Sequence, residues 1–245
     1  MLTDKEIEFM RLSGKILKDV FEKIEKFCVA GKTTLEISNE VERIIRQHKG
    51  EPAFLNYNNF PASACVSVND TLLHGIPRDD IFLKEGDIVS IDIGAIYKGY
   101  YSDACRTFIV GNGNKKAKKI VKVVEECFFK AVSLIKPGIH LGDISNAIEQ
   151  HALANGFSIP RNFTGHGIGK KLHDKPYVFN YGKAGTGILL KEGMCLAIEP
   201  MIAEGSEKVK FLNDGWTVKM LDGKLSAHYE NTVLVTNNGY EILTK

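Results

Sequence analysis

Apolar residues recur with the period of an α-helix through residues 3–50 of the chain. Thr3 with Glu6, and later Thr33 with Glu36, have the spacing of a capping box, in which threonine and glutamate side chains each bind the other residue's backbone amide. Gly50 lies where the C-terminal cap of the second segment belongs. The apolar positions are Ile7, Met10, Leu17, Phe21 and Ile24, then Ile37, Val41, Ile44 and Ile45. The pattern predicts two amphipathic helices ahead of the first strands.

Strand and helix patterns then follow each other twice. Strands are predicted at 65–68, 87–94 and 100–110, and helices are carried by Ile120, Val123, Val124, Cys127 and Phe128, then by Leu141, Ile144 and Ile148, with Gly156 closing the last. Residues 156–189 are rich in Gly, Pro and aromatics with little period, which is typical of a functional loop. Strand patterns resume through 199, 216–220 and 227–236. This order favours an α/β (α+β) fold whose halves resemble each other.

One ten-residue phrase occurs in each half. "LKEGDIVSID" spans 83–92 and "LKEGMCLAIE" spans 190–199, and each ends on an acid. Strand residues alternate faces, so one face carries Ile88, Ser90, Asp92 and Gly94, and the corresponding face of the second copy carries Cys195, Ala197, Glu199 and Met201. We therefore predict one domain, 1–245, with an internal duplication whose halves are roughly 1–112 and 113–245.

A second acid follows in each half, Asp103 in "YYSDACRTFIV" and Glu230 in "HYENTVLV". A turn at Lys98 and Gly99 should bring Asp92 and Asp103 to facing or diagonal positions of a hairpin. The two halves thus supply what we interpret as two matching acid pairs.

Four acids in apolar strands need a compensating charge. Asp and Glu are almost never fully buried unless paired, and no Lys or Arg is adjacent on the same face. Carboxylates gathered in one core would repel each other unless divalent cations neutralised them, and two such ions balance four negative charges. A solvated sheet face bearing the acids is the alternative.

Three histidines are candidates to join these acids in one site. His166 lies between glycines that let its backbone approach another group, His173 follows in "KKLHDKP", and His74 stands in "LLHGIP". His48, His140 and His151 fall on predicted helices or a turn and are expected at the surface. Imidazole and carboxylate ligands accept Co, Mn, Fe or Zn and do not distinguish among them. The sequence has no phosphate-binding loop, H-E-x-x-H helix or G-x-S-x-G elbow.

Composition narrows the class of protein. Apolar residues make up 44% of the 245 residues and charged residues 25%, as in ordinary globular proteins. A net charge of +2 is too small to imply a nucleic-acid partner, and the run "KKAKK" is expected to be a solvated helix start. No stretch has the ~20 apolar residues of a membrane span, and the N-terminus lacks the pattern of a secretory signal. Five scattered cysteines suit a reducing cytosol, so we expect a cytoplasmic protein.

Six segments together carry a family resemblance: "ACVSVNDTLLHGIP", "GDIVSIDIGAIYKGYYSDACRTF", "FTGHGIGKKLHDKP", "AIEPM", "DGWTVK" and "SAHYENTVLVT". In this order, and through nearly the whole chain, they resemble the type I methionine aminopeptidases. The resemblance implies the pita-bread fold, two related halves around a central antiparallel sheet, and two divalent metal ions per chain. It implies that Asp103 and Glu230 bridge the ions, that Asp92 chelates one, and that His166 with Glu199 completes the other.

The same resemblance implies a reaction and a substrate. A hydroxide shared by the ions would attack the first peptide carbonyl, with Glu199 relaying its proton to the leaving amine, His173 binding the carbonyl oxygen and His74 lying near the scissile nitrogen. The side chains matched to the methionine pocket are Tyr57, Phe60, Cys65 and Trp216, joined in substrate binding by His74 and His173. The expected substrates are the N-termini of nascent polypeptides whose second residue is small. A monomer is expected, and contact with the ribosome is an open question.

Some positions depart from the family pattern. Asn56 and Asn59 stand where the family often has glycine, and Phe54 and Leu172 occupy pocket-edge positions of variable type. A proline-directed peptidase of the same fold (a prolidase or an Xaa-Pro aminopeptidase) is one alternative function, although those enzymes usually carry a large extra N-terminal domain. A metal-free binding module is another, although such modules replace the metal ligands, and all five positions are filled here.

Overall fold

The computed structural model describes residues 2–245 and begins with the two predicted helices. α1 (Asp4–Phe27) and α2 (Thr34–Gln47) both open with the predicted capping box. The expected role of Gly50 is wrong, because Lys49 takes the left-handed conformation after α2, with φ 60°. A Cβ at Gly50 would lie 2.9 Å from Ile16 Cδ1, so glycine there permits close packing of α2's end against α1.

The strands of the first half form the predicted hairpin. β4 (Ile88–Tyr97) and β5 (Tyr100–Ile109) pair along their whole length, and the turn residues Lys98 and Gly99 have φ of 51° and 82°. Positive φ at both central residues is the geometry of the two-residue hairpin turn. The remaining elements of this half are β1 (Glu51–Pro52), the short helix η1 (Tyr57–Asn59), β2 (Ala64–Val68) and β3 (Thr71–Leu73).

The second half repeats the order of helices and strands. It comprises α3 (Lys115–Val132), α4 (Leu141–Ala154), β6 (Thr164–Gly167), β7 (Asp174–Phe179), β8 (Cys195–Ile198), β9 (Met201–Ala203), β10 (Val209–Phe211), β11 (Val218–Met220), β12 (Ser226–His228), β13 (Glu230–Val235) and β14 (Tyr240–Ile242). Gly156 ends α4 in the left-handed conformation, as predicted. The expectation of an irregular segment at 156–189 is partly wrong, because it contains β6 and β7. A Cβ at Gly165 or Gly167 would lie within 2.4 Å of a neighbouring strand's carbonyl oxygen, and these glycines conceal the strand signal.

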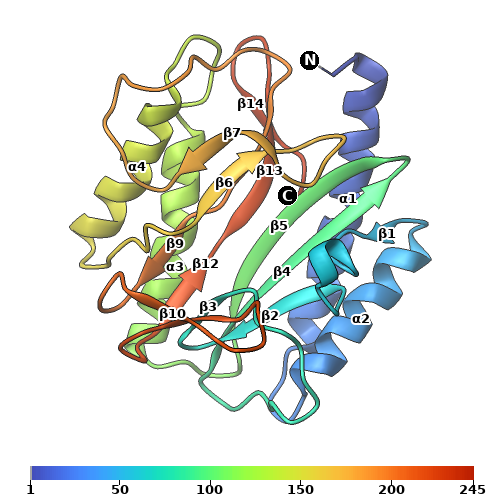
Figure 1. Ribbon diagram of the computed structural model, residues 1–245, viewed down its shortest axis with the longest axis vertical. Helices are drawn as coiled ribbons and strands as arrows, with labels where there is room; N and C mark the ends of the chain where they lie inside the picture. The colour runs from blue at the N-terminus through green and yellow to red at the C-terminus, as the bar shows by residue number, and fades with distance from the viewer. Residues whose placement is uncertain (1) are drawn as a thin grey trace.

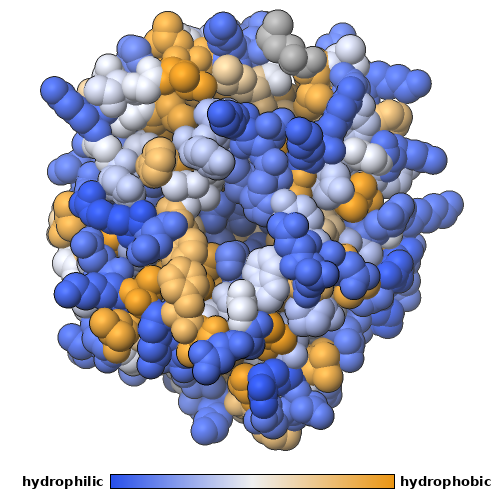
Figure 2. Space-filling model, viewed as in Figure 1, coloured by the Kyte–Doolittle hydropathy of each residue, from blue (hydrophilic) through white to orange (hydrophobic). Residues whose placement is uncertain are grey.

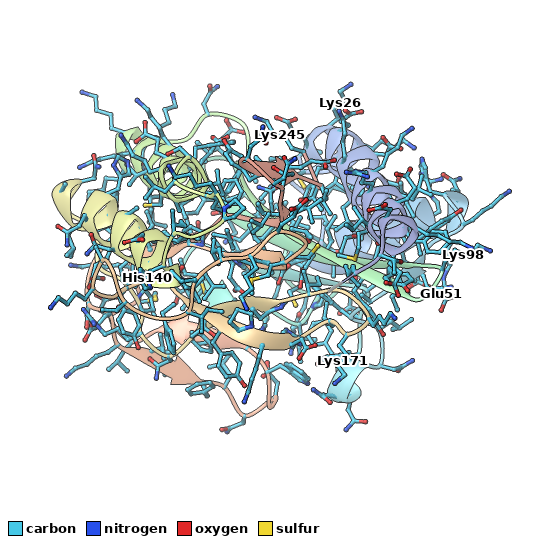
Figure 3. The ribbon with its side chains drawn as sticks, turned by 90° about the horizontal axis from the view of Figure 1, so that it is seen from above. Lys26, Glu51, Lys98, His140, Lys171 and Lys245 are labelled. Atoms are coloured by element: carbon cyan, nitrogen blue, oxygen red, sulfur yellow. The ribbon has the colours of Figure 1, made fainter. Side chains whose placement is uncertain are left out.

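A nine-stranded sheet joins the halves, with the main order β1-β4-β5-β13-β8-β6-β7. The α-helices α1 to α4 lie on one side of it (Figures 1 and 3). Ile91 and Ile93 of β4 pack in the same buried cluster as residues of α1 and α2, and Val233 of β13 packs with residues of α3 and α4. The alternate side chains of these strands point to the opposite face, which we call the cavity face because Asp92, Asp103 and Glu230 line a cavity on it.

The halves are related by a common register. Ile91 lies opposite Arg106 in the first hairpin, and Ile198, which follows the same phrase, lies opposite Asn231. Counting along the strands from these pairs makes Cys105 equivalent to Glu230, and Asp103 equivalent to His228. The predicted acid pairs therefore do not match position for position: each half supplies two acids, but Asp103 and Glu230 are not counterparts.

Candidate metal centre

Five polar side chains meet on the cavity face of the sheet. Asp92 comes from β4, Asp103 from β5, Glu230 from β13, Glu199 from the residue after β8, and His166 from β6. These are five consecutive strands of the sheet. Asp103 lies opposite Gly94, so Asp92 and Asp103 are diagonal neighbours, as the sequence predicted. The sheet order therefore brings together residues that are far apart in the chain.

The five side chains form two overlapping clusters. Potential ligand atoms of Asp92, Asp103 and Glu230 lie within 4.8 Å of one another, and so do those of His166, Glu199 and Glu230. His166 Nε2 also lies 3.7 Å from Asp103 Oδ2 and 3.6 Å from Glu199 Oε1. Glu230 is thus shared by both clusters, and Asp103 contacts the second through His166.

Burial makes this group of carboxyls electrostatically costly. Asp103, Glu199 and Glu230 are at most 8% exposed, which rules out the alternative of a solvated sheet face for these three. Burial, and after it the neighbouring carboxylates, raises the pKa of each of the three well above its usual value. Burial likewise raises the pKa of Asp92 to about 7.

The same side chains carry unused acceptor atoms. Among residues 2–245, Asp92 Oδ1, Asp103 Oδ1 and Glu230 Oε1 are buried without a hydrogen-bond donor. Buried acceptors of this kind need a donor or a cation, and carboxylate oxygens with an imidazole nitrogen are ligands that divalent transition metals accept. The residues present therefore suit divalent cations.

A cavity of about 320 Å³ opens above these carboxyls. Figure 2 shows a hollow near the middle of this face, with hydrophilic and hydrophobic residues at its border. The cavity is lined by every residue predicted for the site, by the edge residues Phe54 and Leu172, and by Asn58, Leu73, Asn162, Phe163, Thr164 and His228. The ring of Phe60 meets that of Trp216 edge-on at 5.2 Å. One wall of the cavity is therefore acidic and another is aromatic.

The loop bearing Tyr57 shows how asparagine replaces glycine. Asn56, Asn58 and Asn59 have φ of 66°, 47° and 66°. Asparagine is among the few residues other than glycine that tolerate this left-handed region. The loop therefore keeps a glycine-like backbone, and it places the Tyr57 hydroxyl 2.8 Å from His173 Nδ1.

The two histidines predicted to bind substrate lie beside the carboxyls. The ring of His173 is 4.3 Å from that of His166, and burial lowers the pKa of His173. His74 has a φ of 55° and meets the ring of Trp216 edge-on at 5.6 Å. Burial, assisted by nearby His173, lowers the pKa of His74 to about 4. Both rings are therefore neutral near pH 7.

Sequence reasoning missed one histidine in the cavity. His228 is 2% exposed, and its Nε2 lies 3.6 Å from Glu199 Oε2 and 3.8 Å from Glu230 Oε2. It precedes Glu230 by two residues, the spacing that puts side chains on one face of a strand, and this signal could have identified it. His48, His140 and His151 line no part of this cavity.

No helix within residues 2–245 is both long enough and apolar enough to cross a membrane. This agrees with the absence of a membrane-span pattern in the sequence.

The comparisons with known proteins agree with this architecture. The model of metallopeptidase family M24 matches residues 8–237. The chain is 49% identical to a methionine aminopeptidase of Clostridium perfringens, covering 98% of this chain and 96% of that protein. A solved methionine aminopeptidase of Thermotoga maritima superposes with a TM-score of 0.98 at 44% identity, covering 100% of this chain and 98% of that one.

A more distant relative helps to separate the branches of this fold. A prolidase from Pyrococcus furiosus has a TM-score of 0.81 at 28% identity, and the match covers 99% of this chain but 64% of the prolidase chain. Methionine aminopeptidase structures are thus nearer in both identity and length, and the predicted pita-bread fold is confirmed. The chain belongs to metallopeptidase family M24.

Proposed function

We propose that this protein is a metal-dependent methionine aminopeptidase, which removes the N-terminal methionine from polypeptides whose second residue is small. One observation carries the proposal: the buried carboxyl cluster forms the acidic wall of a cavity whose other wall is aromatic. Methionine aminopeptidases also match this chain over nearly the full length of both proteins.

Asp92, Asp103, His166, Glu199 and Glu230 would hold two divalent ions. Asp92, Asp103 and Glu230 form one ligand set, and His166, Glu199 and Glu230 form the other. Asp103 would bridge to the second set, since its Oδ2 lies 3.7 Å from His166 Nε2. Divalent ions bound there would polarise the peptide carbonyl and lower the pKa of a water molecule.

The aromatic wall would receive the methionine side chain. The rings of Phe60 and Trp216 meet edge-on, and Cys65, which pairs with Asp92 on the neighbouring strand, lines the same cavity. An unbranched thioether packs well against aromatic rings. Selectivity for methionine would therefore come from shape and apolar contact.

Three residues would act on the reacting atoms. The carboxylate of Glu199 would accept a proton from the attacking water and deliver it to the leaving amine. Tyr57, by donating its hydroxyl proton to His173 Nδ1, would leave the other nitrogen of His173 protonated to bind the carbonyl oxygen as charge develops. Neutral His74, held against Trp216, would lie beside the scissile nitrogen.

The proposed substrates also suggest where in the cell the protein acts. Nascent polypeptides expose an N-terminal methionine in the cytoplasm, so we propose a cytoplasmic enzyme that acts on them as a monomer. Five buried free thiols agree with a reducing compartment.

Hydrolysis of short peptides tests this function. Chelator-stripped protein is incubated with Met-Ala-Ser, Met-Leu-Ser, Leu-Ala-Ser or Ala-Pro-Ser, with and without Co, Mn, Fe or Zn, and the products are measured by mass spectrometry. We expect metal-dependent loss of methionine from Met-Ala-Ser alone. Cleavage of Ala-Pro-Ser would indicate a proline-directed peptidase, and no cleavage with any metal would indicate a binding module.

A further inference from the structure

His228 is held in place by its backbone. The hydroxyl of Thr107 donates to the carbonyl of His228 at 2.7 Å and accepts from its amide at 3.2 Å. The Sγ of Cys105 lies 3.7 Å from the same carbonyl. Both partners belong to β5, the strand of the first half at the junction of the two halves. The imidazole therefore projects into the cavity from a fixed point.

The side chain of His228 has an unused polar atom. Among the described residues, Nε2 is buried without a hydrogen-bond partner. The nearest carboxylate oxygens belong to Glu199 and Glu230, at 3.6 Å and 3.8 Å, a few tenths of an ångström beyond hydrogen-bonding distance. A small rotation of either glutamate would satisfy both partners. The unpartnered Nε2 therefore lies closest to carboxylate oxygens of two proposed metal ligands.

The register between the halves gives this position a further meaning. His228 is the counterpart of Asp103, so it occupies the place where the first half carries a carboxylate of the cluster. A donor at this place, instead of a fifth carboxylate, adds no negative charge to a cluster that already contains four acids.

We propose that His228 is a positioning residue that donates from Nε2 to Glu199 and Glu230 and orients both carboxylates toward the cations. The proposal rests on the proposed function, because it requires these two glutamates to be metal ligands. Hydrogen bonds of this kind orient metal ligands, and losing one typically weakens metal affinity or activity by about 10–100-fold.

Two substitutions separate donation from packing. H228L removes the donor and fills its place with an apolar side chain. H228Q keeps an N–H donor near the position of Nε2. Titration calorimetry of Mn²⁺ into the chelator-stripped protein should show affinity weakened by about 10–100-fold in H228L and by no more than about 3-fold in H228Q. H151L serves as the control, because His151 pairs with Glu126 on the far helices and lines no part of the cavity. Circular dichroism and a melting curve show whether each variant is folded.

Kinetics provide a second readout. With saturating Mn²⁺, H228L should recover most of its activity on Met-Ala-Ser, since excess metal compensates for weaker binding, and the loss should lie in the metal concentration required. Wild-type affinity in a folded H228L would overturn the proposal. An H228Q as weak as H228L would also overturn it, because a donor would then be insufficient. If the wild-type protein bound no metal, the proposed function itself would fail.

Discussion

The two halves of the molecule share a framework and differ in what it carries. Both lead from an "LKEG" phrase into a strand that ends on an acid, Asp92 in one half and Glu199 in the other, and both pair that strand with a following one in equivalent register. Beyond these acids the equivalence fails. Where the first half has Asp103 and Cys105 on the cavity face, the second has His228 and Glu230.

The second half also contains two histidines of the site that have no acidic or basic counterpart in the first half. His166 belongs to β6, and His173 follows it in the β6–β7 connection. The fold therefore repeats the scaffold while the chemistry is distributed unequally. The first half supplies two acids, one histidine and most of the pocket wall, and the second supplies two acids, three histidines and Trp216. A common register supports the predicted duplication, which stays a prediction.

Removing one acid of the first half should have the largest effect. D103A should lose metal binding and activity on Met-Ala-Ser together, with a rate lower by about 1,000-fold or more, since the metal ions contribute several kcal/mol to catalysis. Metal content by plasma mass spectrometry and peptide hydrolysis check this. D80A is the matched control, because Asp80 is an exposed partner of Arg78. A D103A that bound metal like the wild type would show that Asp103 is not a ligand, and an active, metal-free D103A would show that the reaction does not need the metal.

Removing His173, a residue supplied by the second half alone, should have the second-largest effect. H173A should lower kcat by about 100–1,000-fold with little change in KM, because a donor to the developing oxyanion is lost. Y57F should have a smaller effect of the same kind, since it removes only the hydroxyl that lies 2.8 Å from His173 Nδ1. Steady-state kinetics at saturating metal measure both, with H140A as control. Unchanged kcat in H173A would exclude this role.

The metal-free cluster should lose stability as pH rises. Folding raises the pKa of Asp92, from 3.8 to about 7, and those of Asp103, Glu199 and Glu230. When folding raises the pKa of a carboxyl, its contribution to the free energy of unfolding is fully present below the pKa of the unfolded state. That contribution is lost as the pH rises through the pKa of the folded state. The buried histidines have lowered pKa values, so their contribution is already complete above pH 6.5.

Between pH 6.5 and 8 the change in the free energy of unfolding with pH should therefore come from the carboxyls alone. We expect the free energy of unfolding of the metal-free protein to fall by about 1.4 kcal/mol per pH unit for each carboxyl still protonated. Urea unfolding at several pH values, with and without Mn²⁺, measures this. The metal-loaded protein should show no such fall, and an equal slope in both forms would contradict a shared cation site.

The helices, the β4–β5 hairpin and the placement of Asp92 diagonal to Asp103 could be predicted, because capping boxes, turn residues and alternation are local signals. β6 could not, since Gly165 and Gly167 are there to admit a neighbouring backbone, a contact that the local pattern does not contain. The offset between Asp103 and Glu230 also escaped prediction, because register depends on pairing between distant strands. His228 was visible in principle, two residues before Glu230.

Thr107 and Thr232 allow the sharpest comparison of the halves, because they occupy equivalent positions on either side of the junction. Only two residue pairs join β5 and β13 directly, Cys105 with Glu230 and Ala104 with Asn231. Each threonine extends this contact through its hydroxyl, which binds both the amide and the carbonyl of one residue on the other strand segment. Thr232 binds Asp103 in this way, and Thr107 binds His228. T232V and T107V should each lower the free energy of unfolding by about 1–3 kcal/mol, since a buried amide loses its acceptor. Metal affinity should differ. T232V moves the backbone of a proposed ligand and should weaken Mn²⁺ binding by about 10-fold. T107V should weaken it less, because the Thr107 hydroxyl binds His228 and Ser90, neither of which is a proposed ligand. Equal losses of affinity would mean that the junction sets the geometry of the cluster as one rigid unit, and that the inequality between the halves lies only in their side chains.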